Sequence, residues 1–227
     1  MEGAACAREN GCDFIVALGG GSVMDASKAI AAMATNDGDL WDYVAGGTGK
    51  ALPLKEEPLP IIAVTTTAGT GSEVDQYGVI SNDETKEKIG FGGYDSLFPR
   101  IAVVDPELMT SVPPKFTAYQ GFDALFHSVE CYIAAPANLI SDMYALTAIE
   151  NIGAYLARAV KDGSDIEAEN MCICQYTVRC SHDFERLHKR TFDGTRHERL
   201  PSRSAARSRT DHDLQGILHS LYRKTCL

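Results

Sequence analysis

The segment CDFIVALGGGSVMDASK, residues 12–28, constrains the fold more than any other part of the chain. The uninterrupted apolar run at residues 14–18 is typical of a short strand in a parallel sheet that is covered on both faces. Three glycines follow this run, and the Ala-rich stretch after them predicts a helix with Ser22 as its N-terminal cap. A buried strand, a glycine turn and a helix in this order predict an α/β layer built on a parallel sheet.

The chain up to about residue 112 continues this pattern. Further buried strands are predicted in PIIAVTTT, residues 60–67, and in RIAVVDP, residues 100–106. A hairpin is predicted where QYGVISN and EKIGFGG flank a short polar turn. We therefore expect an α/β domain at residues 1–112.

The pattern becomes helical after Pro113 and Pro114. Residues 115–135, KFTAYQGFDALFHSVECYIAA, are predicted to form one helix. A second helix is predicted from its apolar residues at three- and four-residue steps, which are Met143, Leu146, Ile149, Ile152, Leu156 and Val160. We expect an all-helical second domain at residues 113–171.

Two loops have the composition of phosphate-binding turns. The first holds Gly20, Gly21 and Ser22, where glycine lets the backbone approach a phosphate and a helix N-terminus offers free N–H groups. The second, TTTAGTGSE at residues 65–73, adds several hydroxyls. Both follow strands, so they should meet at the carboxyl edge of the sheet, where α/β proteins bind ligands. A tight turn without a ligand remains the alternative for each loop taken alone.

Asp123 and His127 lie four residues apart in the predicted first helix of the second domain, so they share a helical face. A carboxylate and an imidazole suit Fe²⁺ or Zn²⁺, although a surface ion pair is the commoner explanation for such spacing. Lys88 has the length to reach a ribose or a phosphate, and a solvated strand lysine is its alternative explanation.

Charge and cysteine content exclude several classes of protein. The formal net charge of −10 argues against a nucleic-acid partner or an anionic membrane surface. No apolar run has the length of a membrane span, and no signal peptide is recognisable. Seven cysteines without regular spacing favour a reducing compartment over a disulfide scaffold. We expect a cytoplasmic protein.

In order and spacing, GGGSVMDASK, TTTAGTGSE and VVDPELMTSVPPKFTAYQGFDALFHSVE resemble the iron-containing alcohol dehydrogenases over residues 9–171. The resemblance implies a Rossmann-like nucleotide-binding domain followed by a helical metal-binding domain. It also implies interconversion of alcohols with aldehydes or ketones by NAD or NADP. The partners would be a small alcohol or aldehyde, and a homodimer is left open.

The resemblance also assigns roles to particular residues. Asp123 and His127 correspond to the first two ligands of Fe²⁺ or Zn²⁺, through which they would act in catalysis. Asp25 corresponds to a fixed aspartate whose role is not assigned. Thr65 stands where the family often has proline. The cofactor-binding positions correspond to Gly20, Gly21, Ser22, Asp25, Thr66, Thr67, Thr70 and Lys88.

The last 56 residues, 172–227, depart from the family pattern. They carry a net charge of +5, against −15 for residues 1–171, and lack both helical and strand periodicity. The family's later histidine ligands, one of them in a Pro-His-Gly segment, have no counterpart here, although five histidines occur: His182, His188, His197, His212 and His219. We interpret this tail as a frameshifted, poorly ordered stretch, with a genuine basic tail as the rival.

We also expect the family's first strand–helix units to precede residue 1. The chain is thus interpreted as a fragment with incomplete metal and cofactor sites and impaired activity. The alternatives are a zinc-type glycerol or polyol dehydrogenase relative, and an inactive remnant that binds nucleotide or self-associates.

Overall fold

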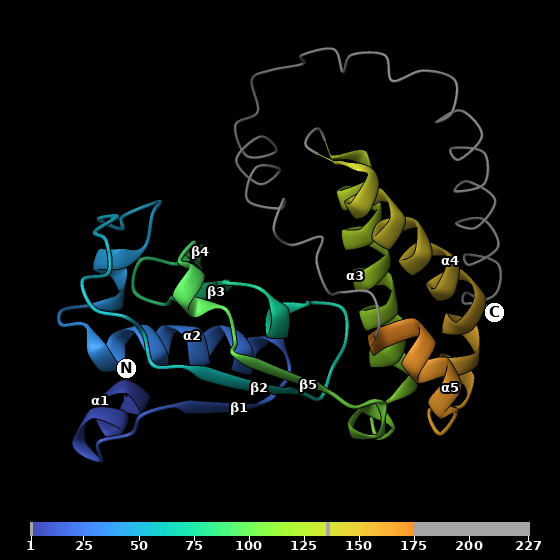
Figure 1. The fold of residues 1–227 in the computed structure, drawn as a ribbon, viewed down its shortest axis with the longest axis horizontal. Helices are drawn as coiled ribbons and strands as arrows, with labels where there is room; N and C mark the ends of the chain where they lie inside the picture. The colour runs from blue at the N-terminus through green and yellow to red at the C-terminus, as the bar shows by residue number, and fades with distance from the viewer. Residues whose placement is uncertain (1, 135–136, 175–227) are drawn as a thin grey trace, which may run out of the picture. The chain divides into compact units, whose positions relative to one another are not determined.

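The structure, a computed structural model, describes residues 2–134 and 137–174 of the chain (Figure 1). They form two compact units. The first contains the residues up to 67 and residues 71–105, and the second contains residues 68–70 and the chain from 106 onward. The division falls at Asp105, whereas the sequence placed it after residue 112.

The first unit is built on a three-stranded parallel sheet in the order β1–β2–β5. These strands are β1 (Ile15–Gly19), β2 (Ile61–Thr65) and β5 (Ile101–Val104), as the sequence predicts. In the register, Gly19 lies opposite Thr65, and Thr65 opposite Val104. The three strands therefore end at one edge, and the loops that follow β1 and β2 leave the sheet side by side.

Helix α2 (Gly21–Thr35) packs along the sheet, where its Met24 and Ala31 share a core with Ile61 of β2. The hairpin of β3 (Tyr77–Asn82) and β4 (Glu87–Gly92) is antiparallel, as predicted. A second core, centred on Phe91 and Leu97, joins this hairpin to α2. The remaining elements of the unit are α1 (Glu2–Glu9) and the short 3₁₀ helices η1 (Leu40–Tyr43), η2 (Ser72–Val74) and η3 (Asp95–Leu97).

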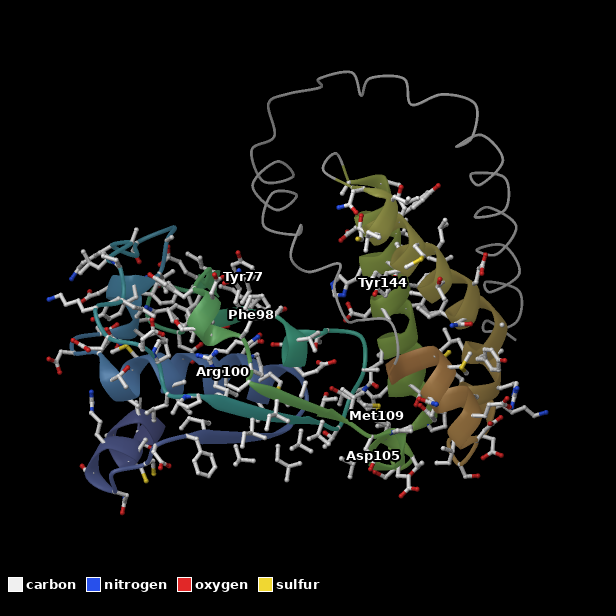
Figure 2. All side chains as sticks on the ribbon, viewed as in Figure 1. Tyr77, Phe98, Arg100, Asp105, Met109 and Tyr144 are labelled. Atoms are coloured by element: carbon white, nitrogen blue, oxygen red, sulfur yellow. The ribbon has the colours of Figure 1, made fainter. Side chains whose placement is uncertain are left out.

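Two expectations about the first unit are wrong. Ser22 is not the cap of α2, because Gly20 occupies the N-cap position and the helix begins at Gly21. The strands are not buried on both faces either, since Val16 and Leu18 are 56% and 62% exposed. Alternate side chains of a strand point to opposite faces, and α2 covers the face that holds Ala17 and Ala63. Side chains of the other face project away from α2 in Figure 2.

The second unit is helical, as predicted. It contains η4 (Pro106–Met109), α3 (Pro114–Ile133), α4 (Leu139–Lys161), the short helix α5 (Ile166–Glu169) and a π-helical turn, η5 (Asn170–Cys174). Asn138 begins α4 with a capping box, in which its side chain accepts hydrogen bonds from the backbone N–H groups of Ile140 and Ser141.

Helices α3 and α4 bury the apolar row predicted for α4 only in part. Ile149, Ile152 and Leu156 are at most 2% exposed, whereas Met143 is 53% exposed, although all four lie in the predicted helix. Met143 lies in the second turn of α4, where the face towards the core is occupied by Ala145. Neither α3 nor α4, the two long helices of the described part, combines the length and apolarity needed to cross a bilayer.

Candidate functional site

The two glycine-containing loops meet at the carboxyl edge of the sheet, which confirms that prediction. The backbone N–H of Thr66 donates to the carbonyl oxygen of Gly19 at 3.0 Å. A Cβ atom placed on Gly20 would lie 2.7 Å from Oγ1 of Thr67, so the backbone of the first loop runs directly against the second. The glycine is needed here because any larger residue would displace Thr67.

The first loop also has the features of an anion site. Gly20 caps α2 without a side-chain hydrogen bond, and its carbonyl oxygen accepts from the N–H groups of Val23 and Met24. The N–H groups of Gly21 and Ser22 precede the first intrahelical donor, so helix geometry gives them no acceptor within α2. Ser22 is exposed. Free amides at a helix N-terminus fit the pyrophosphate of a dinucleotide.

Asp25 has a structural role that the sequence did not assign. Its Oδ1 accepts from the Ser72 hydroxyl at 2.7 Å, and its Oδ2 accepts from the backbone N–H of Val79 at 2.9 Å. The carboxylate thus ties α2 to the chain that follows the second loop. Its two partners within the described residues are protein groups, which supports a role in shaping the loops.

The second loop divides between the two units. Thr66 and Thr67 remain with the sheet, while exposed Thr70 belongs to the segment 68–70 of the helical unit. Thr65, which replaces the family's frequent proline, donates its hydroxyl to the Thr67 carbonyl at 2.8 Å and so stiffens the start of the loop by other means.

Lys88 lies on β4, exposed and opposite Ser81. In the part of the chain that the structure describes, no hydrogen bond or ion pair joins it to either loop. Its contact with a cofactor therefore stays a prediction.

Asp123 and His127 share one face of α3, as predicted. His127 Nε2 lies 3.9 Å from Asp123 Oδ1, and their side chains are 35% and 47% exposed. On the other side of the ring, Nδ1 lies 2.9 Å from the carbonyl oxygen of Gly69. A carbonyl oxygen only accepts, so Nδ1 donates to it, and in the neutral imidazole Nε2 is then the nitrogen that can bind a metal. Asp123 and His127 could therefore be two ligands of one divalent cation. The Gly69 carbonyl oxygen, which is bonded to Nδ1, would orient the histidine ring.

Segment 68–70 is seated on α3 around this pair. The N–H of Ala68 donates to Gln120 Oε1 at 3.3 Å. A Cβ atom on Gly69 would lie 2.8 Å from the Gln120 carbonyl oxygen and 2.9 Å from Asp123 Oδ2. Gly69 therefore allows the close approach that brings its carbonyl to His127.

The further metal ligands are not among the described residues. Within residues 2–134 and 137–174, no three His, Cys, Asp or Glu side chains gather where they could hold a metal ion. His182, His188, His197, His212 and His219 all lie outside the described residues.

Fold and site define a Rossmann-like α/β domain followed by a helical domain. Profiles of the families "Iron-containing alcohol dehydrogenase" and "Fe-containing alcohol dehydrogenase family, C-terminal" match residues 1–106 and 117–180. The chain belongs to the iron-containing alcohol dehydrogenase family. The second match ends nine residues beyond the predicted limit of 171.

Among curated relatives, a choline dehydrogenase of Bacillus subtilis is 44% identical over 167 residues, which are 74% of this chain and 41% of the relative. Among solved structures, a sulfoacetaldehyde reductase from Bifidobacterium kashiwanohense in complex with NAD⁺ is 40% identical with a TM-score of 0.71, covering 78% of this chain and 46% of that one. The archaeal alcohol dehydrogenase ADH/D1 from a Red Sea brine pool is 42% identical with a TM-score of 0.72, covering 80% and 46%. The chain thus spans about two-fifths of the length of the curated relatives that it matches.

Proposed function

We propose that this chain belongs to an enzyme that transfers a hydride between a nicotinamide cofactor, NAD or NADP, and an alcohol/aldehyde pair. One observation carries the proposal: the loop whose first residues meet the glycine turn continues to Gly69, whose carbonyl binds His127 of the Asp–His pair. Motifs for the cofactor and for the metal are therefore physically connected through one short loop. The comparisons support the reaction class, because the sulfoacetaldehyde reductase, which is 40% identical to this chain over the matched part, was solved in complex with NAD⁺.

We assign the cofactor and the metal to different groups of residues. The amides at Gly21 and Ser22 would hold the pyrophosphate, and the hydroxyls of Thr66, Thr67 and Thr70 would contact the ribose or the nicotinamide amide. Fe²⁺ or Zn²⁺ held by Asp123 and by Nε2 of His127 would supply a Lewis acid for the alcohol or carbonyl oxygen. In the oxidation, the carbinol C–H bond breaks with transfer of a hydride to the nicotinamide, and the hydroxyl proton leaves to solvent.

The substrate within this class is left open. The relatives are named for choline, methanol, 1,3-propanediol and 4-hydroxybutyrate, which differ in charge and size. A zinc-dependent polyol dehydrogenase and a remnant that only binds nucleotide or self-associates are the other outcomes of the tests. We further propose a cytoplasmic location, which is supported by the free thiols of Cys6, Cys12 and Cys172 in the described part of the chain.

We propose that metal binding by this chain alone is weak and its turnover of simple alcohols low. Asp123 and His127 are the two candidate ligands that the described residues bring together, and a partial ligand shell loses affinity by orders of magnitude. Metal analysis of the purified chain with an assay of nicotinamide absorbance checks this. Stoichiometric iron or zinc with clear alcohol oxidation would contradict the weak site.

A titration with Co²⁺ tests the metal pair itself, since cobalt absorbs visible light when bound by nitrogen and oxygen ligands. We expect a weak but saturable spectrum that is lost in Asp123→Asn and in His127→Gln. Glu150→Gln, an exposed carboxylate on α4, is the matched control and should bind as the unaltered chain does. Equal cobalt spectra in all four proteins would show that the pair is not a metal site.

A further inference from the structure

Lys28 is a fully buried lysine in the first unit, 0% exposed and one helical turn beyond Asp25. Its ammonium group donates to the Ser72 carbonyl at 2.7 Å, to the Ser72 hydroxyl at 2.8 Å, to Asp75 Oδ1 at 2.6 Å and to the Tyr77 carbonyl at 2.6 Å. Tyr77, labelled in Figure 2, is the first residue of β3. One side chain of α2 thus holds the chain at three successive points after the second loop.

Neighbouring carboxylates complete this cluster. Asp25 accepts from the Ser72 hydroxyl and from the Val79 N–H, and Asp75 Oδ1 also accepts from the backbone N–H of Tyr77. Segment 72–79 is therefore bonded to α2 by charge-assisted hydrogen bonds, which are about twice as strong as neutral ones.

The N-terminal end of the same loop is also held by a hydrogen bond. Thr66 donates its N–H to Gly19, the last residue of β1. The loop between Thr66 and Ser72 is therefore held at one end by the β1 backbone and at the other by Lys28. The first anchor, Gly19, adjoins the glycine turn that begins α2, and the second, Lys28, lies about two helical turns further along α2.

Packing does not account for a lysine at this position. Burial lowers the pKa of Lys28 and raises the pKa of Asp75, so desolvation opposes the charged form of each. Buried ion pairs are often replaceable by apolar residues of similar volume without loss of stability. What an apolar residue does not reproduce is the direction of bonds to Ser72, Asp75 and Tyr77.

We propose that Lys28 is a positioning residue for the second cofactor loop, which it fixes beside the glycine turn through Ser72. The inference rests on the proposed function, since it concerns the same cofactor site. Lys28 touches no cofactor atom in this account. Its effect reaches the cofactor through the geometry of Thr66 and Thr67, which lie in the same unit as Lys28.

The test uses the full chain and two readouts. NADH and NADPH affinities are measured by nicotinamide fluorescence, and amide hydrogen exchange is measured without cofactor. Lys28→Met should weaken binding about tenfold, the loss typical of an outer positioning partner. Exchange should rise in residues 66–72 and 75–79 and stay unchanged in β1 and β2. Lys55→Met, which alters an exposed lysine of the same unit, is the control.

Ser72→Ala is the second variant, because it leaves the Lys28–Asp75 ion pair in place and removes only the hydroxyl. It should weaken binding to a smaller extent and raise exchange at the same loop, which keeps the inference testable if Lys28→Met does not fold. Unchanged exchange in residues 66–72 in either folded variant, or a uniform rise through the whole unit, would overturn the positioning role. If the unaltered chain binds neither NADH nor NADPH, the proposed function fails, and the exchange data still decide what Lys28 does.

Discussion

Gly69 is the residue through which the second glycine loop reaches Asp123 and His127. Its φ of +96° lies in a region that side-chain-bearing residues rarely adopt, and its carbonyl is the acceptor for His127 Nδ1. An added Cβ would also meet the Gln120 carbonyl oxygen and Asp123. Conformation and space therefore both demand glycine at this position.

We predict that Gly69→Ala weakens Co²⁺ binding about tenfold or more, because it displaces Asp123 and removes the acceptor that orients the His127 ring. The cobalt titration described above measures the change. Gly90→Ala, where an added Cβ has no neighbour within 4 Å, is the control and should bind cobalt normally. Normal cobalt binding by a folded Gly69→Ala would show that the loop does not support the pair.

Glu169 makes the stability of the helical unit depend on pH. It is 1% exposed, neither carboxylate oxygen has a hydrogen-bond partner among the described residues, and desolvation followed by the charge of Asp165 raises its pKa to about 7. A folded-state pKa above the unfolded value of 4.5 favours folding when the group is protonated. This contribution is fully present below about pH 4.5 and is lost as the pH rises through about 7.

We predict that Glu169→Gln raises the free energy of unfolding by about 2–3 kcal/mol at pH 8 relative to the unaltered chain, and by much less at pH 5. Thermal unfolding of both proteins at the two pH values measures this difference. Since other groups titrate equally in both, a gain that is the same at pH 5 and pH 8 would show that Glu169 is ionised normally.

At the scale of elements, short-range sequence patterns predicted which helices and strands form. They did not predict which faces of the strands are covered by other elements. The strands, the hairpin and both long helices follow from alternation, turn residues and three- to four-residue spacing. The exposed face of β1 does not, because a run of apolar residues is the same whether one face or two are covered. The start of α2 was shifted as well, since a serine in the first turn resembles a cap, whereas the glycine before it does the capping.

Close packing of α3 on α4 depends on Gly121. A Cβ atom there would lie 2.2 Å from Cδ1 of Leu156, which is 0% exposed. We predict that Gly121→Val destabilises the helical unit by about 1–3 kcal/mol, the range for overpacked cores. Adding Leu156→Ala should recover part of this loss, so the two changes should be less than additive in chemical denaturation. If the destabilisations by the two substitutions simply add, residues 121 and 156 are not in contact, which would contradict the prediction.

At the scale of the whole molecule, the order of three motifs identified the family and its candidate ligands, because such motifs depend on local spacing. The contact of Lys28 with Asp75 joins residues 47 positions apart, and no local pattern reports it. The seating of segment 68–70 on α3 was also beyond the sequence, since it places part of a loop in the other unit. Each of these contacts joins residues of one unit that are far apart in the sequence.

The cofactor claim is tested most directly by titrating the 227-residue chain with NADH and NADPH and following nicotinamide fluorescence. We predict weak, saturable binding of at least one of them, with a dissociation constant of about 0.1–1 mM. Gly20→Val should abolish it, because the added side chain meets Thr67 beside the glycine turn that begins α2, while Gly90→Val should bind normally. A folded chain without saturable binding, or equal binding by Gly20→Val, would contradict the account.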